Sequence, residues 1–206
     1  LWLLPLTRLF AWIQVYGLEQ LAGINSPVIF AANHQSYMDT PVILAALPPS
    51  MRYRATTAMA KEFFAPHFHP KGHTRRARFS NGLNYYLSTA LFNAFPLPQR
   101  EAGTRQALRY AGELIGAGNS VIIYPEGRRT AGDAIDRFQP GAALIAARLG
   151  VPVVPVRLRG LDAVLGLGHR MAHPGRVEVT FGAQLRLSGS DYTGLTARLE
   201  AAVKAL

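Results

Sequence analysis

Apolar residues along this chain fall into short continuous runs that alternate with stretches of helical periodicity. The runs have the length of buried strands and lie at 27–32, 120–124 and 151–156, and two segments of more mixed polarity at 51–59 and 177–181 are also predicted to be strands. Apolar positions three and four residues apart predict helices that begin near Pro41 and Pro140, cover 81–95 and 104–117, and close the chain after a cap at Ser190 or Asp191. Because strands alternate with helices, we predict an α/β fold: a single domain whose central, largely parallel or mixed β-sheet is flanked by helices.

The N-terminal segment has a different pattern. Its first sixteen residues are apolar and aromatic, but Arg8 interrupts them and they are too few to span a bilayer. A proline in the first turn and Gly17 at the end predict an amphipathic helix. This helix either lies in a membrane interface or packs on the core, and a truncated spanning helix is a third alternative. We therefore separate an N-terminal amphipathic, membrane-associating segment at 1–25 from the domain at 26–206.

Composition and charge limit the partners. The chain has 206 residues, 49% of them hydrophobic, which is enough for one sizeable core. Its formal net charge of +10 implies an anionic partner, and nucleic acid, anionic lipid and phosphorylated metabolites all satisfy that condition. The lack of cysteine excludes disulfides, thiolate zinc sites and a cysteine nucleophile. Since the chain begins at Leu1 rather than methionine, we expect it to be a processed or excised part of something longer.

The candidate chemistry begins at the end of the first predicted strand, where His34 and Asp39 lie five residues apart. Residues at this spacing on one continuous helix point about 140° apart, so the two side chains meet only if the chain turns between strand and helix. A carboxylate that accepts from one imidazole nitrogen fixes the tautomer and leaves the other nitrogen free to take a proton. We predict that His34 is a general base oriented by Asp39, with Ser36 as a turn residue. The alternative is a loop histidine beside a helix capped by Asp39 or Thr40.

A second polar block follows the strand at 120–124 and reads Tyr124-Pro125-Glu126-Gly127-Arg128-Arg129-Thr130. Ligands of open α/β sheets bind at the carboxyl ends of the strands, so we expect this block to face the His34 loop.

Residues 65–78 are basic and rich in turn formers. His67, His69 and His73 lack the carboxylate or cysteine neighbours that would complete a metal site, so we predict no metal there. Arg75, Arg76 and Arg78 precede an aromatic stretch and are interpreted as a surface that meets anionic head groups.

The two polar blocks together resemble the glycerolipid acyltransferase family typified by lysophosphatidate acyltransferase. Its hallmarks are Asn-His-x4-Asp and Phe-Pro-Glu-Gly-Thr-Arg-Ser. Asn33, His34 and Asp39 match the first hallmark. The block at 124–130 matches the second, with Arg128 in place of threonine and with Tyr124 and Thr130 in place of phenylalanine and serine. The resemblance extends over about 26–182 and makes 26–206 an acyltransferase domain.

The resemblance implies an O-acyltransferase that moves a fatty acyl group from acyl-CoA or acyl-ACP to the hydroxyl of a lysophospholipid, in the first instance lysophosphatidate giving phosphatidate. No cofactor is implied beyond the acyl thioester co-substrate. The residues implied for acceptor binding are Glu126 on the glycerol side, Gly127 beside it, Arg129 on the phosphate, Arg128, Arg100 after a short apolar strand, and Lys61.

The expected partners are a lysophospholipid acceptor, an acyl thioester on coenzyme A or acyl carrier protein, and an anionic membrane surface. We expect peripheral, monotopic membrane association on the cytoplasmic face and a bacterial origin. Two alternatives stay open: another lysolipid or glycolipid acceptor, and a non-catalytic basic module that binds membrane or nucleic acid. Nucleic-acid binding has no use for His34 with Asp39, and Glu126 would repel phosphate, so we do not expect nucleic acid as a partner.

Overall fold

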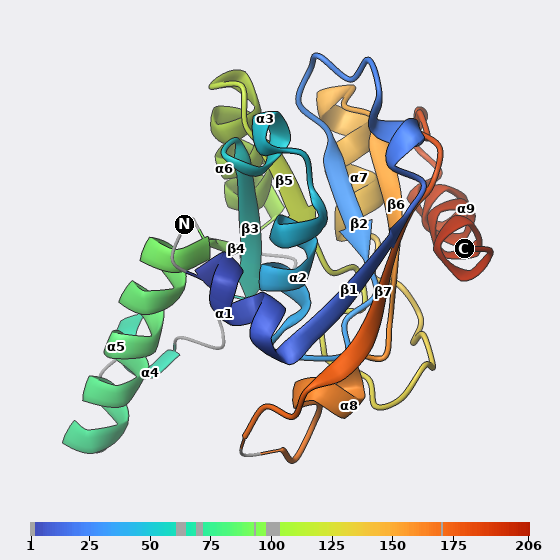
Figure 1. The fold of residues 1–206 in the computed structure, drawn as a ribbon. Helices are drawn as coiled ribbons and strands as arrows, with labels where there is room; N and C mark the ends of the chain where they lie inside the picture. The colour runs from blue at the N-terminus through green and yellow to red at the C-terminus, as the bar shows by residue number, and fades with distance from the viewer. Residues whose placement is uncertain (1–2, 61–64, 69–71, 93, 98–103, 170) are drawn as a thin grey trace.

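The structure is a computed structural model. It describes residues 3–60, 65–68, 72–92, 94–97, 104–169 and 171–206. In this part of the chain seven strands form one sheet in the order β1-β7-β6-β2-β5-β3-β4 (Figure 1). The strands are β1 Ala11–Tyr16, β2 Ile29–Ala32, β3 Ala55–Ala60, β4 Ala94–Leu97, β5 Ser120–Ile123, β6 Val153–Arg159 and β7 Gly175–Phe181. Neighbouring strands pair in parallel except β6 with β7, so the predicted α/β fold with a mixed sheet is confirmed.

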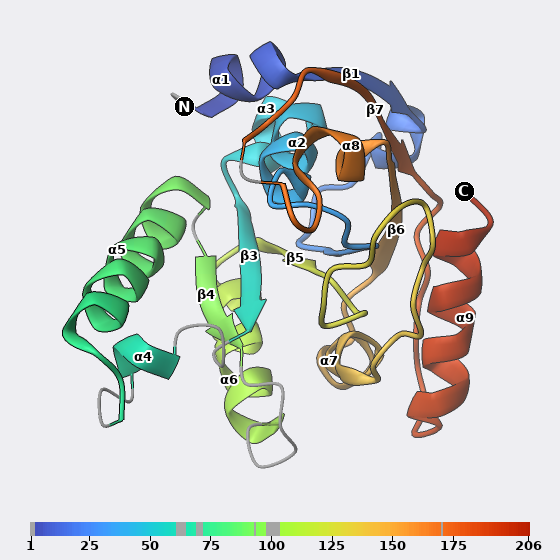
Figure 2. The ribbon, with the colours of Figure 1, turned by 90° about the horizontal axis from the view of Figure 1, so that it is seen from below.

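Helices cover both faces of the sheet. They are α1 Leu3–Phe10, the 3-10 turn η1 Leu18–Leu21, α2 Asp39–Ala46, α3 Pro49–Arg52, α4 Ala65–Phe68, α5 Arg75–Phe92, α6 Thr104–Gly116, α7 Gly141–Leu149, α8 Leu161–Leu165 and α9 Tyr192–Lys204. Figure 2 shows α1, α2 and α8 on one face, α6, α7 and α9 on the other, and α4 with α5 beyond the β4 edge. Within the described residues, no helix has both the length and the apolar character needed to cross a membrane.

The central strand β2 shows why the sequence forms two cores. Its four residues are fully buried. Phe30 and Ala32 join the cluster under α2 and α8, whereas Ile29 and Ala31 join the cluster under α6, α7 and α9. A strand buried on both faces reads as a continuous apolar run, and this is the signal that predicted β2, β5 and β6.

The helix predicted over the first sixteen residues is wrong in its second half. α1 ends at Phe10, and the next six residues form β1, which pairs in parallel with β7. The β-branched Ile13 and Val15 alternate with exposed residues, which is the period of a strand. Gly17 therefore ends a strand, not a helix. Its φ is 71°, and a Cβ added there would lie 2.0 Å from the Phe181 carbonyl oxygen. The segment at 1–25 thus contributes an edge strand to the sheet.

Two further boundaries differ from the prediction. Pro49–Arg52 forms α3, so β3 begins at Ala55 rather than at residue 51. The basic stretch before residue 81 is not a loop throughout, because α5 already begins at Arg75 and includes all three predicted arginines. The hydroxyl of Thr74 accepts from the Ala77 N–H at 3.2 Å at the start of this helix, a capping contact that the sequence interpretation overlooked.

The last helix begins as predicted. Asp191 is the N-cap of α9, and its carboxylate accepts from the Gly194 N–H at 3.0 Å. The apolar side chains of Leu195, Leu199 and Val203, which lie at helical spacing along α9, are buried against the core, whereas Leu206 follows the helix and is half-buried.

Candidate active site

The candidate site lies where β2 and β5 end side by side. The two strands pair in parallel, so the loops that follow Ala32 and Ile123 leave the same edge of the sheet. The chain then continues through α2 on one face after β2, and through α7 on the other face after β5 (Figure 2). Neighbouring strands that send the chain to opposite faces form the crevice in which open α/β sheets bind ligands.

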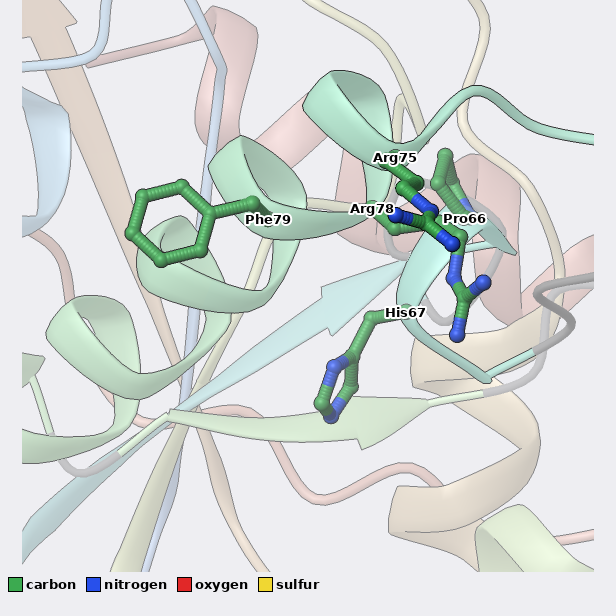
Figure 3. A pocket seen from close by; sticks show the side chains of 5 residues that line it. All are labelled: Pro66, His67, Arg75, Arg78 and Phe79. Atoms are coloured by element: carbon green, nitrogen blue, oxygen red, sulfur yellow. The ribbon is translucent and has the colours of Figure 1, made fainter.

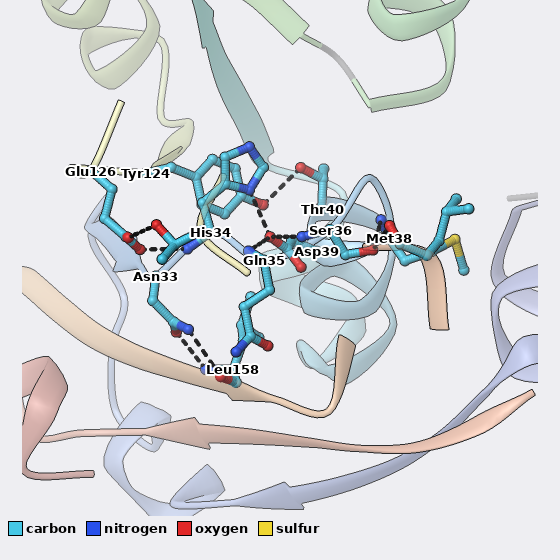
Figure 4. A network of polar contacts seen from close by, with 12 residues as sticks. Asn33, His34, Gln35, Ser36, Met38, Asp39, Thr40, Tyr124, Glu126 and Leu158 are labelled. Atoms are coloured by element: carbon cyan, nitrogen blue, oxygen red, sulfur yellow. Dashed lines mark hydrogen bonds and ion pairs between the residues drawn. The ribbon is translucent and has the colours of Figure 1, made fainter. Parts of the chain in front are cut away.

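His34 and Asp39 meet across the first of these loops, as predicted (Figure 4). Nδ1 of His34 lies 2.6 Å from Oδ2 of Asp39. The Asp39 side chain is fully buried, whereas 24% of the His34 side chain is exposed. No described residue hydrogen-bonds to Nε2 of His34, and with Nδ1 engaged by Asp39 this nitrogen is the one that can accept a proton.

Asp39 serves the His34 loop rather than the end of α2. The helix begins at Asp39 itself, and no side chain makes a capping hydrogen bond there. Oδ2 of Asp39 accepts instead from the backbone N–H of Gln35 at 2.7 Å and of Ser36 at 3.0 Å. The cap considered at Asp39 or Thr40 is therefore wrong, because the Asp39 carboxylate turns back toward the loop and the Thr40 hydroxyl contacts the Tyr124 hydroxyl. These bonds fix the carboxylate, which in turn favours the tautomer that carries its proton on Nδ1.

Glu126 ties the second polar block to the His34 loop. It is 4% exposed, and its Oε1 accepts from the His34 N–H at 2.8 Å. Its Oε2 accepts from the Thr130 hydroxyl at 2.7 Å and from the Asp136 N–H at 2.9 Å. The Thr130 N–H also donates to the His34 carbonyl at 2.8 Å. Both carboxylate oxygens are engaged by the chain, so a contact of Glu126 with the acceptor glycerol stays a prediction.

The ring of Tyr124 stacks on the His34 imidazole. The ring centres lie 4.2 Å apart with 19° between the planes, and the Tyr124 hydroxyl lies 2.8 Å from Oγ1 of Thr40. Burial, reinforced by the nearby Asp39 carboxylate, raises the pKa of Tyr124 well above its usual range, so the phenol is neutral at physiological pH. Sequence reasoning quoted Tyr124 in the second block and Thr40 as a possible cap, but it assigned neither of them a contact at His34.

Other polar residues of the first motif hold the loop in place. Oδ1 of Asn33 accepts from the Leu158 N–H at 2.7 Å, and its Nδ2 donates to the Leu158 carbonyl at 3.0 Å, which extends the pairing of β2 with β6. The Ser36 hydroxyl donates to the Leu165 carbonyl at 2.6 Å, which places Ser36 in the turn as predicted. The buried Gln35 donates to a carbonyl of the loop after β5 at 2.6 Å.

The adjacent arginines of the second block have different surroundings. Arg128 is exposed and pairs with Asp136, with Nε at 2.9 Å from the carboxylate. The Arg137 backbone N–H and the Arg128 side chain lower the pKa of Asp136. The guanidinium carbon of Arg129 lies 3.5 Å from the centre of the Tyr37 ring. Nη1 of Arg129 is buried without a hydrogen-bond partner among the residues described.

The remaining predicted acceptor residues are placed only in part. Gly127 lies in the turn after β5 with a φ of 72°, a conformation in which glycine is unstrained. Lys61 and Arg100 lie outside the described residues.

A separate hollow of about 410 Å³ lies between α4 and α5 (Figure 3). It is lined by Pro66, His67, Arg75, Arg78 and Phe79. None of these residues belongs to the His34 network, and the two arginines are among those predicted to meet anionic head groups.

A family model and curated relatives both identify acyltransferases as the proteins that this chain is similar to. Residues 12–159 match the family model described as Acyltransferase. A chloroplastic 1-acyl-sn-glycerol-3-phosphate acyltransferase of Brassica napus is 28% identical over 172 residues, which cover 79% of this chain and 44% of the relative. One from Arabidopsis thaliana is 28% identical over 160 residues, covering 77% of this chain and 39% of the relative. The chain thus spans less than half the length of these relatives.

A solved structure shares the fold. The crystal structure of the 1-acyl-sn-glycerophosphate acyltransferase PlsC from Thermotoga maritima matches with a TM-score of 0.65 and 22% identity, covering 98% of this chain and 79% of that one. The family-model match includes the His34 loop and the block at 124–130. On this match over most of its length, the chain belongs to the acyltransferase family.

Proposed function

We propose that this chain is an O-acyltransferase that moves a fatty acyl group from a thioester to the hydroxyl of a lysophospholipid, with lysophosphatidate as acceptor and phosphatidate as product. The observation that carries the proposal is the 2.6 Å contact between His34 and the buried Asp39, with Nε2 of His34 left without a described partner. The names of the two plant relatives and of the Thermotoga maritima protein support this choice of acceptor.

In the proposed reaction His34 acts as a general base. Its Nε2 takes the proton of the acceptor hydroxyl while the hydroxyl oxygen forms a bond to the thioester carbonyl carbon. The tetrahedral intermediate then breaks its C–S bond, and the imidazolium returns the proton to the leaving sulfur. An alcohol and a thioester become an ester and a thiol, with no change of oxidation state and no acyl group on the enzyme. Asp39 faces the positive charge that His34 carries between the two steps.

We assign the acceptor phosphate to Arg129. A buried guanidinium nitrogen without a partner is costly, and phosphate oxygens are strong acceptors for it. Arg128 is already paired with Asp136, so its effect on the acceptor is indirect. Glu126 acts in this proposal by holding the two loops together. Roles of Lys61 and Arg100 near the acceptor stay predictions.

The donor in this proposal is acyl-CoA or acyl-ACP. The thioester itself supplies the activated acyl group, so the proposed chemistry calls for no additional cofactor. The net charge of +10 favours anionic donors such as the phosphate-bearing coenzyme A.

We further propose peripheral association with an anionic membrane on its cytoplasmic face. Exposed apolar side chains gather on two parts of the described chain, namely Leu6, Leu9 and Trp12 of α1 and β1, and Phe79, Leu83, Tyr86 and Leu87 of α5. The α5 residues have the spacing of a single helix face, and Arg75 and Arg78 lie at its start. An apolar face beside basic residues is the pattern of a helix that lies in a membrane interface.

The proposal is tested by incubating the purified chain with lysophosphatidate and either acyl-CoA or acyl-ACP. Phosphatidate is measured by mass spectrometry, and released thiol is measured in parallel. We expect one phosphatidate for each thiol, and little thiol when the acceptor is left out. Thiol released at the same rate without acceptor, and with no ester formed, would show a thioester hydrolase instead.

A further inference from the structure

The arginine assigned to the acceptor phosphate rests on a tyrosine ring. The guanidinium carbon of Arg129 lies 3.5 Å from the ring centre of Tyr37. Tyr37 belongs to the loop that carries His34, and Arg129 belongs to the loop after β5. The adjoining Thr130 N–H donates to the His34 carbonyl at 2.8 Å, so the two loops are also joined through their backbones. The stack therefore links the proposed base to the proposed phosphate ligand.

The turn holds Tyr37 in place although this residue is 55% exposed. In the preceding residue, the Ser36 hydroxyl donates to the Leu165 carbonyl at 2.6 Å and accepts from the Met38 N–H at 3.0 Å. The Ser36 N–H donates to Asp39 at 3.0 Å. A ring on a backbone fixed in this way loses little freedom when a cation stacks on it, which makes it a preorganised platform.

The Arg129 guanidinium has a donor without an acceptor, whereas the neighbouring Arg128 is paired. Nη1 of Arg129 is buried without an acceptor in the described part of the chain, while the exposed Arg128 pairs with Asp136. A ring covers one face of a guanidinium and leaves its in-plane N–H groups free to bind a ligand. Phosphate oxygens match those N–H groups in both charge and geometry.

We propose that Tyr37 is a specificity-determining residue: by carrying Arg129, it sets the preference for an acceptor with an anionic phosphate over an uncharged one. This inference rests on the proposed function, in which Arg129 receives the acceptor phosphate. A cation over an aromatic face changes a binding constant by a factor of roughly two at an exposed site and roughly thirty when the pair is desolvated. The loss of preference on removing the ring is expected in that range.

The test is a double-mutant cycle on the full chain with two acceptors, lysophosphatidate and monoacylglycerol. The variants are Tyr37→Leu, Tyr37→Phe, Arg129→Ala and the pair Tyr37→Leu with Arg129→Ala. The quantity compared is the ratio of kcat/KM for the two acceptors. Tyr37→Phe is the matched control because it keeps the ring. Flotation of Tyr37→Leu with anionic vesicles reports whether the exposed ring is instead a membrane contact.

We expect Tyr37→Leu to lower the ratio by about two- to thirtyfold, mainly through KM for lysophosphatidate, and Tyr37→Phe to stay within about twofold of wild type. In the Arg129→Ala background, Tyr37→Leu should change the ratio no further, because the two act as a unit. If the two substitutions lower the ratio independently, so that their factors multiply, the role of Tyr37 is wrong while the role of Arg129 stands. The same conclusion follows if Tyr37→Leu no longer floats with anionic vesicles. If Arg129→Ala lowers both acceptors equally, the phosphate assignment fails and this inference fails with it.

Discussion

The imidazole of His34 is fixed on two sides and open on one. Asp39 holds Nδ1 at 2.6 Å, and the Tyr124 ring covers one face with its centre 4.2 Å away. The Tyr124 ring is anchored in turn by the 2.8 Å contact with the Thr40 hydroxyl at the start of α2. The direction of Nε2 is therefore set by a carboxylate and an aromatic ring together, and a base must be well aligned to transfer a proton.

We predict that Tyr124→Leu lowers kcat by about two- to twelvefold, because a stacked aromatic pair contributes about 0.5–1.5 kcal/mol. Tyr124→Phe keeps the stack and should stay within about threefold of wild type. Burial raises the pKa of Tyr124 above its ordinary value, so the phenol is neutral at physiological pH and the phenylalanine variant should keep the alkaline limb of the pH–rate profile. Loss of that limb in Tyr124→Phe would mean that the phenol itself transfers a proton.

The contrast between Arg128 and Arg129 gives a second prediction for single residues. Arg129→Ala should weaken use of lysophosphatidate by about ten- to a hundredfold and leave hydrolysis of the thioester by water much less affected. Arg128→Ala is the matched control, because that arginine is exposed and engaged with Asp136. We expect it to change the preference between lysophosphatidate and monoacylglycerol by less than about threefold. Equal losses in the two variants would argue against the separate roles given to them.

At the scale of elements, the site depends on two loops held in contact by one buried carboxylate. Glu126 accepts from three donors of the chain, one of them the His34 N–H at 2.8 Å. A glutamine amide has a single oxygen, so Glu126→Gln would place an NH₂ group against at least one of these donors.

We predict that Glu126→Gln costs about 1–3 kcal/mol in the free energy of unfolding and lowers kcat as well, because His34 loses its anchor. Urea denaturation and steady-state kinetics measure the two effects. Glu113→Gln on the exposed surface of α6 is the control and should alter neither. A stable Glu126→Gln variant that loses only KM for the acceptor would instead support a direct contact with glycerol.

Elements with both faces buried were predictable from the sequence. β2 and β5 are continuous apolar runs, and α7 lies between Pro140 and Gly150, whose φ of 64° ends the helix. The His34 and Asp39 pair was predictable too. Residues at that spacing meet only across a turn, and the sequence predicts a turn between the strand that ends before His34 and the helix that begins near Pro41.

Elements at the rim of the sheet were harder to predict. In β1 the run of apolar and aromatic side chains masked the two-residue alternation around Ile13 and Val15. The strand also depends on β7, which lies far away in the sequence. The stacks of Tyr124 on His34 and of Arg129 on Tyr37 likewise join separate loops, so only the fold shows them.

At the scale of the whole molecule, we predict that membrane binding requires the apolar face of α5. Replacing Leu83 and Tyr86 with serine should lower the fraction that floats with anionic liposomes by tenfold or so, because two exposed apolar side chains no longer enter the interface. Tyr110→Ser on α6 is the control, since that tyrosine is exposed on a different helix.

Arg75→Ala with Arg78→Ala should weaken the same binding by about fivefold per residue, and salt should reduce the difference from wild type. If both α5 variants float like wild type, the membrane contact lies elsewhere, and the exposed side chains of Leu6, Leu9 and Trp12 are the next group to test.

The most direct measurement is the rate at which His34→Ala forms phosphatidate from lysophosphatidate and an acyl thioester. Removing a positioned general base costs on the order of 10² to 10⁴ in rate, and His34 lies on a loop outside the hydrophobic clusters, so we expect the activity to fall by that factor while the variant still folds. His73→Ala, at an exposed histidine before α5, is the control and should keep wild-type activity. A folded His34→Ala variant that forms phosphatidate at a near-normal rate would contradict the assignment of His34 as the base.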